Sequence, residues 1–383
     1  MLPHLRISTG LLAVLIAGCT IPGFEKTPPS AQKLMQERIE LTGAWFLANA
    51  DEDEFLHYEF LVNSGKFTKE NNELRKMGAA WSITELYRFT GDTQYRELAE
   101  QGVLHFLQFI VNDEKGFSYL DVDGKRKLGY NGLFMMTLLG LDPSPGRDVL
   151  LKSLAAGILH QQKEDGSYNT YFYSDQNTGQ DFYPGEANLA LISLYEQTGD
   201  KQYRDAVARS FPYYRDYWRG NRSWAFIPWH SQSLTRLWRS DPRDEYRDFV
   251  FEINDMIIEG QQTPEDNNDA EEIGGFGGDP GISTASYLEG INDAYALAKE
   301  VGDTKRVERY GEVIRLGAEF LMRLQYTGDQ RFDRKFLPPH ILGGVRQSLG
   351  SDRLRVDNNQ HAAAALIKSY ENGLVPSIPT QKE

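Results

Sequence analysis

The chain has 383 residues, of which 40 % are hydrophobic and 12 % aromatic, and its formal net charge is −14. The hydrophobic content is enough for a large core, so the composition excludes global disorder. The negative charge argues against binding to nucleic acid, whose phosphates select basic surfaces. Beyond the N-terminus, no segment reaches the roughly 18 to 20 apolar residues that cross a bilayer.

The first residues of the chain have the pattern of a short secretion signal. Arg6 precedes the apolar run 11–17, which is too brief for a membrane-spanning anchor. Residues 16–19, Ile-Ala-Gly-Cys, resemble the bacterial lipobox, in which the cysteine thiol is lipidated and becomes the mature N-terminus. The alternative is a buried cysteine behind an ordinary signal peptide. Because Cys19 is the only cysteine, internal disulfides and cysteine-based zinc sites are excluded.

The lipobox resemblance divides the chain into three parts. Residues 1–18 are expected to form a lipoprotein signal peptide, 19–30 a lipidated, Pro-rich tether, and 31–383 a single folded domain. The lipid on Cys19 would attach the protein to a membrane of the bacterial cell envelope. Thr20 stands where an inner-membrane retention signal has Asp, so the outer membrane or the cell surface is favoured.

Three stretches of the chain repeat one pattern, a helix that ends at Gly-Asp and is followed by a second helix. They span residues 83–107, 191–215 and, more weakly, 291–321. The glycine at each junction tolerates the left-handed conformation that closes a helix. Tyrosine and leucine recur at helical spacing on both sides, so each stretch is predicted to be a helical hairpin.

The rest of the chain continues this series to twelve predicted helices. Their approximate ranges are 31–49, 75–90, 93–111, 130–140, 145–161, 185–198, 201–218, 229–240, 244–261, 284–301, 304–325 and 359–372. Long loops alternate with tight turns between them. This alternation predicts an all-α fold, an (α/α)6 barrel of six helical hairpins in a ring, with short β pieces in the long loops.

The even-numbered helices of this series are predicted to form the inner ring. They contain the Gly- and Ala-rich segments that crowding favours, such as Met-Gly-Ala-Ala-Trp at 77–81 and the four alanines at 362–365. Their N-termini would meet at one mouth of the barrel, beneath the long loops. Helix N-termini present unpaired N–H groups and partial positive charge, which suit polar and anionic ligands.

All six inner helices begin with polar or aromatic residues, and these are the candidate site. The catalytic candidates are Glu186, His230, Glu289, Asp357 and His361. The substrate-binding candidates are Arg75, Tyr130, Asn131, Tyr183, Trp229, Gln232, Asp279 and Gln360. Aromatic side chains stack on the apolar faces of a sugar ring, while polar groups hydrogen-bond its hydroxyls. The predicted partner is therefore a glycan.

Several of these residues also have a purely structural explanation. Asn131 fits an ordinary helix cap, and a first-turn carboxylate such as Glu186 is favoured by the helix dipole. Glu289 lies too deep in its helix to be a cap. Its burial needs a partner, for which Arg75 and Arg355 are the candidates.

Two groups of acidic residues could be local or solvated rather than parts of a site, although the run at 264–272 could also hold calcium through oxygen ligands. Asp357 follows Arg355 with one residue between them, so a local ion pair explains it without a ligand. The run of carboxylates at 264–272 lacks the spacing of a calcium-binding loop. No cofactor is predicted, and the sequence does not show whether a metal is used.

His230 and His361 open the fourth and sixth inner helices. Histidine changes its protonation near neutral pH, so two histidines that face one cleft can act as base and acid. The alternative is that each only satisfies a loop carbonyl. With Arg75 on the first inner helix, they resemble the pattern of the N-acylglucosamine 2-epimerase group, within the six-hairpin sugar-processing superfamily, over residues 30–372. Ser233 stands where that family usually has glutamate.

The resemblance implies proton abstraction and return at a sugar carbon, with the two histidines as acid and base and Arg75 holding an oxygen. Epimerisation or β-elimination of this kind needs a cation near the developing enolate. Hydrolysis with inversion needs instead two carboxyl groups roughly 6.5 to 9.5 Å apart. Glu186 with Asp357, or Glu289 with either, would supply them.

The sequence therefore predicts a surface-anchored carbohydrate-active enzyme, either a glycoside hydrolase or a sugar epimerase or lyase. The alternative is a non-catalytic glycan-binding or polysaccharide-assembly lipoprotein with the same barrel, which Ser233 favours. The oligomeric state does not follow from the sequence.

Overall fold

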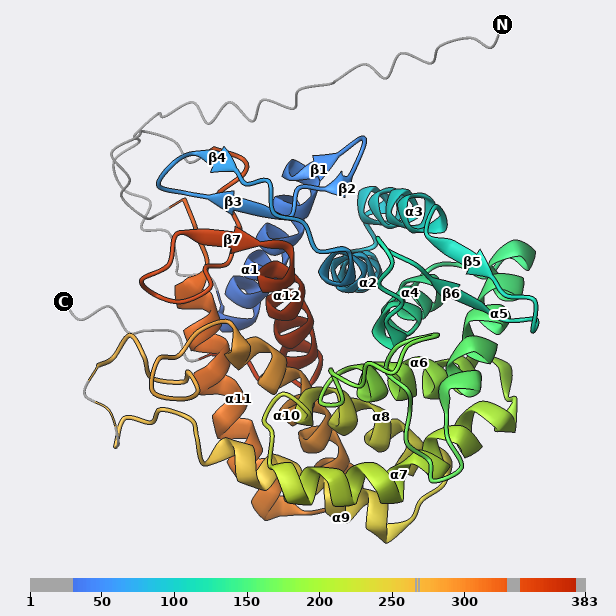
Figure 1. Cartoon of the computed structure of the whole chain (residues 1–383). Helices are drawn as coiled ribbons and strands as arrows, with labels where there is room; N and C mark the ends of the chain where they lie inside the picture. Colours follow the sequence, from blue (N-terminus) through green and yellow to red (C-terminus); the bar gives the residue numbers. More distant parts are fainter. Residues whose placement is uncertain (1–29, 266, 268, 329–337, 377–383) are drawn as a thin grey trace, which may run out of the picture.

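The structure, a computed structural model, describes residues 30–265, 267, 269–328 and 338–376, which fold into a ring of helices (Figure 1). Within these residues there are twelve α-helices. They are α1 (Ala31–Ala48), α2 (Glu73–Thr90), α3 (Thr93–Leu107), α4 (Leu128–Gly140), α5 (Pro145–Gln161), α6 (Tyr183–Thr198), α7 (Lys201–Asn221), α8 (Ile227–Ser240), α9 (Asp244–Ile258), α10 (Ser283–Val301), α11 (Thr304–Leu324) and α12 (Val356–Glu371).

The even-numbered helices form a closed inner ring. Each packs against the next, and α12 returns to α2 (Figure 1). The odd-numbered helices lie outside, each against the inner helix that follows or precedes it in the chain. The predicted (α/α)6 barrel and the assignment of even helices to the inner ring are confirmed.

The Gly-Asp junctions have the geometry that the sequence predicted. Gly91, Gly199 and Gly302 close α2, α6 and α10 in the left-handed conformation, with φ of 73°, 72° and 73°. The aspartate after each glycine caps the next helix, as Asp200 does by accepting from the backbone N–H of Gln202. One dipeptide thus ends an inner helix and begins an outer one.

Small residues let the inner helices approach closely. A Cβ atom on Gly132 of α4 would lie 3.0 Å from the backbone of Glu186 on α6. A Cβ atom on Gly290 of α10 would lie 3.0 Å from the Cα of Pro228 on α8. A larger residue at either place would push its helix outward, which explains the Gly- and Ala-rich inner segments.

Short strands in the long loops tie the ring together above one mouth. β1 (Ala50–Asp51) pairs with β2 (Phe55–Leu56), and β5 (Ile110–Asn112) pairs with β6 (Ser118–Leu120), both antiparallel. A third sheet has the order β4 (Lys66–Phe67), β3 (Glu59–Leu61), β7 (Arg353–Arg355). β3 belongs to the first long loop and β7 leads directly into α12, so this sheet joins the two ends of the barrel (Figure 1).

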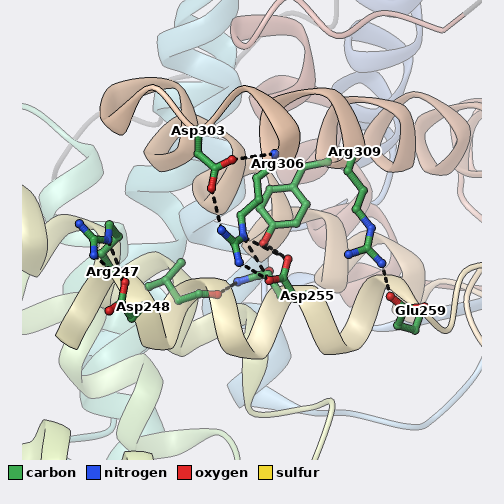
Figure 2. Close-up of polar contacts among 10 residues, drawn as sticks. Arg247, Asp248, Asp255, Glu259, Asp303, Arg306 and Arg309 are labelled. Carbon is green, nitrogen blue, oxygen red and sulfur yellow. Dashed lines mark hydrogen bonds and ion pairs between the residues drawn. The ribbon is translucent and has the colours of Figure 1, made fainter. Parts of the chain in front are cut away.

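The outer face between α9 and α11 is fastened by ion pairs, which Figure 2 shows. Arg306 donates to Asp255 at 2.7 Å and to Asp303 at 2.6 Å. Asp255 also accepts a 2.7 Å hydrogen bond from Tyr310, and Arg309 pairs with Glu259. Every charge in this cluster has a partner from the same two helices or their caps.

The inner helices begin one to three residues earlier than predicted. Pro184 and Pro228 lie in the first turns of α6 and α8. Proline is tolerated there because the backbone N–H that it lacks would have no partner within the helix. α12 begins at Val356, so Asp357 lies inside its first turn. The lipidation site predicted at Cys19 lies outside the described residues. In the part of the chain that the structure describes, no helix is long and apolar enough to span a bilayer.

Candidate active site

A cavity of about 430 Å³ opens at the N-terminal ends of the inner helices, and all six of these helices contribute to its walls. It is referred to below as the mouth cavity. On α6, α10 and α12 the lining residues recur three or four positions apart, which is the spacing of one helix face. The lining of the whole cavity includes Leu74, Arg75, Lys127, Tyr183, Glu186, Trp229, Ser283, Ser286, Tyr287, Asp357, Gln360 and His361.

His361 is held by a buried carboxylate. Its Nδ1 lies 2.7 Å from Oε1 of Glu289 on the neighbouring helix α10, and Glu289 is 1 % exposed. Burial lowers the pKa of His361, but the charge and hydrogen bond of Glu289 and the charge of Asp357 outweigh it, so the pKa is raised above 6.5. Within the described residues Nε2 makes no hydrogen bond, and it remains for a ligand. This is the arrangement of an oriented acid/base histidine.

Glu186 lies in the first turn of α6 and is 4 % exposed. Its Oε2 is buried without a hydrogen bond, and the space for it exists because a Cβ atom on Gly129 would lie only 2.3 Å away. Burial raises the pKa of Glu186 to about 8, although the charge of Lys127 opposes this. Glu186 is therefore a neutral carboxylic acid at pH 7, able to donate a proton.

Asp357 sits between two arginines. Its Oδ2 lies 2.9 Å from a guanidinium nitrogen of Arg355 and 3.4 Å from Nε of Arg75. Arg75 also donates to the hydroxyl of Tyr58. The predicted local pair of Asp357 with Arg355 is present, and Arg75 from the first inner helix joins it. Oδ1 of Asp357 has no hydrogen bond and is buried.

Aromatic and amide side chains complete the walls. Trp229 packs edge-on against His361 with ring centroids 6.3 Å apart, and its other neighbour is Trp81 at 6.3 Å. Tyr183 and Gln360 also line the mouth cavity. Seven of the predicted site residues thus come together here: Arg75, Tyr183, Glu186, Trp229, Asp357, Gln360 and His361. Glu289 joins them through His361 and not through Arg75 or Arg355.

His230 does not line the mouth cavity. It is 1 % exposed and stacks on Phe226, with ring centroids 3.6 Å apart and an angle of 5°. Burial lowers its pKa to about 3, so the ring is neutral. The neighbouring residue Trp229 faces the cavity instead, because successive residues on a helix point about 100° apart.

Four other predicted residues have places outside the lining. Asn131 donates to the carbonyls of Ser118 and Leu154 at 2.9 and 3.0 Å, which is a structural role different from the predicted cap. Gln232 accepts from Lys368 at 2.8 Å. Tyr130 is buried and does not line the cavity, and Asp279 is exposed in the loop before α10.

Sequence reasoning missed Lys127 and Tyr287, which both line the mouth cavity. Lys127 is the residue directly before α4, so the pattern of polar residues at inner helix starts extends to it. Tyr287 lies four residues after Ser283 on one face of α10, where helical periodicity places it. Among the described residues, no group of three or more His, Cys, Asp or Glu is placed to hold a metal ion.

Comparison with known proteins identifies the architecture. No protein-family model matches the sequence, and no curated protein matches it. Among solved structures, a D-mannose isomerase has a TM-score of 0.67 at 12 % identity, covering 91 % of this chain and all 100 % of its own. A cellobiose 2-epimerase from Bacillus thermoamylovorans has a TM-score of 0.62 at 13 % identity, with 89 % and 99 % of the two chains covered. A GH76A α-1,6-mannanase from Salegentibacter has 0.64 at 12 %, with 89 % and 99 % covered. At these identities the likeness establishes the fold: the chain is a six-hairpin (α/α)6 barrel, the architecture of these sugar-processing enzymes.

Proposed function

We propose that this protein is an enzyme that acts on a carbohydrate by proton transfer at a sugar carbon, and that the mouth cavity is its active site. The observation that supports this most strongly is the His361–Glu289 pair beside Glu186, a carboxyl that is neutral at pH 7. The two groups form a base and an acid in one cavity whose walls include aromatic side chains. The barrel is also that of a D-mannose isomerase and a cellobiose 2-epimerase.

In the proposed reaction neutral His361 is the base. Because Nδ1 is bonded to Glu289, Nε2 takes the proton from a sugar carbon next to a carbonyl group. The electron pair of the C–H bond moves toward the carbonyl oxygen, which becomes an enolate oxygen. Glu186 donates a hydrogen bond or its proton to that oxygen, and the positive charge of Arg75 lies in the same cavity.

The position of His230 limits the outcome of this reaction. Inversion at one carbon needs a proton donor on the face opposite to the base. His230 is stacked on Phe226 outside the cavity, which leaves Glu186 as the donor for inversion. A single histidine that both removes and returns the proton favours isomerisation. If the proton is removed and a leaving group departs, the result is β-elimination.

Hydrolysis of a glycosidic bond is the second candidate, and Asp357 is the reason. A carboxylate between two arginines, with one oxygen free of hydrogen bonds, is suited to act as base or nucleophile. Glu186 would then protonate the leaving oxygen. Both candidate reactions use Glu186 as the acid. They differ in the second group, which is His361 as the base in proton transfer and Asp357 as the base or nucleophile in hydrolysis.

The test is incubation of the protein in D2O with neutral and acidic oligosaccharides and polysaccharides. Deuterium bound to carbon, or unsaturated ends, is the expected result and would assign proton transfer at carbon. New reducing ends without deuterium would assign hydrolysis. Binding without any turnover, lost in Trp229→Ala and only modestly weakened in His361→Ala and Glu186→Ala, would assign the non-catalytic alternative.

We also propose that the enzyme is exported and anchored to the outer membrane or cell surface through a lipid on Cys19. The support is the lipobox-like segment at 16–19 and the absence of any other cysteine in the chain. Labelling of cells with a palmitate analogue should mark the protein and should fail for Cys19→Ala. Label retained in that variant would contradict the anchor.

A further inference from the structure

One cation of the mouth cavity has no carboxylate partner. Nζ of Lys127 makes no hydrogen bond and no ion pair with any residue that the structure describes. It lies 5.5 Å from the ring centroid of Tyr130 and 5.9 Å from that of Tyr183. Burial lowers the pKa of Lys127, as expected for an ammonium group whose water is partly removed. The three N–H donors of this half-buried ammonium group therefore have no hydrogen-bond acceptor among the described residues, and Glu186 and Tyr171 act on it only through their charge when they are ionised.

Other buried or half-buried lysines of this chain are paired. Lys76 is fully buried and lies 3.6 Å from a carboxylate oxygen of Glu73 and 3.6 Å from one of Glu54. Lys368 forms an ion pair with Asp293. Since the fold supplies partners for these lysines, the lack of one at Lys127 is specific to the cavity.

The charges around the cavity do not cancel. Arg75, Arg355 and Lys127 are cations, and the two arginines share the carboxylate of Asp357. The second cavity carboxyl, that of Glu186, is neutral at pH 7. The buried carboxylate that pairs with the cavity histidine adds one negative charge when that ring is neutral and is cancelled when the ring is protonated, so three cations face at most two negative charges. The result is a positive cavity in a chain whose net charge is −14.

We propose, building on the function proposed above, that the substrate is a sugar with an anionic substituent, a carboxylate or a sulfate, and that Lys127 binds this group. An anion at Nζ would satisfy the unused donors and restore the neutrality of the cavity. The aromatic rings of Tyr130 and Tyr183 do not compete with the anion for Lys127, because a ring face is a weaker partner for an ammonium group than an anion is. Glu186, being neutral, does not repel it.

The experiment measures binding of acidic oligosaccharides by the full chain. The ligands are oligomers of galacturonic, glucuronic, mannuronic and guluronic acid, the same oligomers after reduction of their carboxyl groups, and sulfated oligosaccharides. Binding is measured by calorimetry at about 0.15 M salt. This salt screens interactions between charges more than roughly 8 Å apart, so the direct contact between the ligand anion and Lys127 dominates the measured difference. We expect at least one acidic ligand to bind about tenfold or more tightly than its neutral counterpart. The preferred ligand distinguishes carboxylate from sulfate.

Three variants locate the effect. Lys127→Met should weaken the acidic ligand about tenfold to a hundredfold and leave the neutral ligand unchanged, because a charged hydrogen bond is lost. Lys127→Arg should restore most of the binding. Lys125→Met, two residues away and exposed, is the matched control and should bind as the parent does. Thermal unfolding of Lys127→Met confirms that the variant is folded.

Several outcomes would overturn the inference. Equal binding of acidic and neutral oligomers, or equal weakening of both by Lys127→Met, would show that the substrate is not recognised through an anion. Turnover of neutral sugars in the D2O test would then leave the proposed function intact. Failure of every carbohydrate to bind or react would contradict both the anionic substrate and the proposed function.

Discussion

Two groups of charged residues in this protein differ in whether their side chains have hydrogen-bond and ion-pair partners. On the outer face between α9 and α11, Arg306 joins Asp255 and Asp303, and Asp255 also accepts from Tyr310 (Figure 2). In the mouth cavity, Glu186 has no hydrogen bond, and Lys127 has no ion pair among the described residues. The outer charges are partly exposed and paired, whereas the buried Glu186 and the half-buried Lys127 of the cavity lack such partners among the described residues.

The difference separates groups that stabilise the barrel from groups that await a ligand. Exposed ion pairs contribute little each, about 0 to 1 kcal/mol. A buried polar group without a partner costs roughly 1 to 3 kcal/mol. A fold that satisfies its charges on the outside but not in one cavity keeps the cavity reactive at the expense of stability.

The largest expected effect is the loss of the base. His361→Asn removes the imidazole and should lower kcat/KM by about a hundredfold to ten-thousandfold. The rate of deuterium incorporation from D2O measures it. Trp81→Phe, a change at a buried neighbour of Trp229 that does not line the mouth cavity, is the control and should keep the rate of the parent. A loss smaller than tenfold in His361→Asn would transfer the role of base to Asp357.

Glu289 should act on His361 through its charge. Glu289→Gln removes the carboxylate that raises the histidine pKa, so the acidic limb of the kcat/KM profile should move to lower pH. Glu289→Asp should return it toward the parent position. An unchanged profile in the Gln variant would leave Glu289 with a packing role only.

Glu186 should reduce stability as the pH rises. Its ordinary pKa is 4.5 and burial raises the pKa to about 8, so the folded protein keeps a proton that the unfolded chain releases. Stability from this group is full below pH 4.5 and is lost between pH 4.5 and 8, by at most about 5 kcal/mol at 1.36 kcal/mol per pH unit. Glu186→Gln should remove this loss and abolish turnover. Urea unfolding at pH 5 and pH 8 measures the first effect, and parallel curves for parent and variant would contradict it.

His230 should act in the opposite direction. Burial lowers its pKa from 6.5 to about 3, so the unfolded chain binds a proton that the folded protein excludes. Stability is full above pH 6.5 and falls as the pH is lowered, by about 3 kcal/mol at pH 4. Between pH 7 and pH 4, the free energy of unfolding should fall less in His230→Leu than in the parent. Urea unfolding at the two pH values measures this difference. Retained turnover in this variant would support a single catalytic histidine.

The smallest effect is expected on the outer face. Asp255→Ala breaks the contacts with Arg306 and leaves the buried hydroxyl of Tyr310 without an acceptor, so the free energy of unfolding should fall by about 1 to 2 kcal/mol. Asp248→Ala removes only the exposed pair with Arg247 and should change it by less than about 0.5 kcal/mol. Neither should alter turnover. A loss of activity in Asp255→Ala would contradict the separation of the two groups of charges.

The fold could be predicted because local signals repeat along the chain. Gly-Asp junctions set the hairpins, and small residues identified the inner helices. Which first-turn residues enter the cavity could be predicted only in part, because that depends on the rotation of each helix about its axis. Asp357, Gln360 and His361 share one face, whereas Asn358 turns away to the carbonyl of Val345. The pattern of polar residues at the start of a helix does not reveal this rotation.

Contacts between distant segments could not be predicted for the same reason. The sequence offered Arg75 or Arg355 as the partner of Glu289, and the partner is His361. His230 and Trp229 are neighbours in the chain, yet only Trp229 lines the cavity. A histidine at the start of an inner helix therefore identifies the correct end of the barrel but not the correct face of the helix.

The sheet that joins β3 to β7 has a consequence for synthesis of the protein. Residues 59–61 leave the ribosome well before their partners at 353–355 and the helix that follows these partners. Until then α2 has no α12 beside it, and neither Asp357 nor His361 is present. A chain that stops before residue 353 therefore lacks the assembled mouth cavity, and the cavity forms only when α12 packs against α2 and closes the ring.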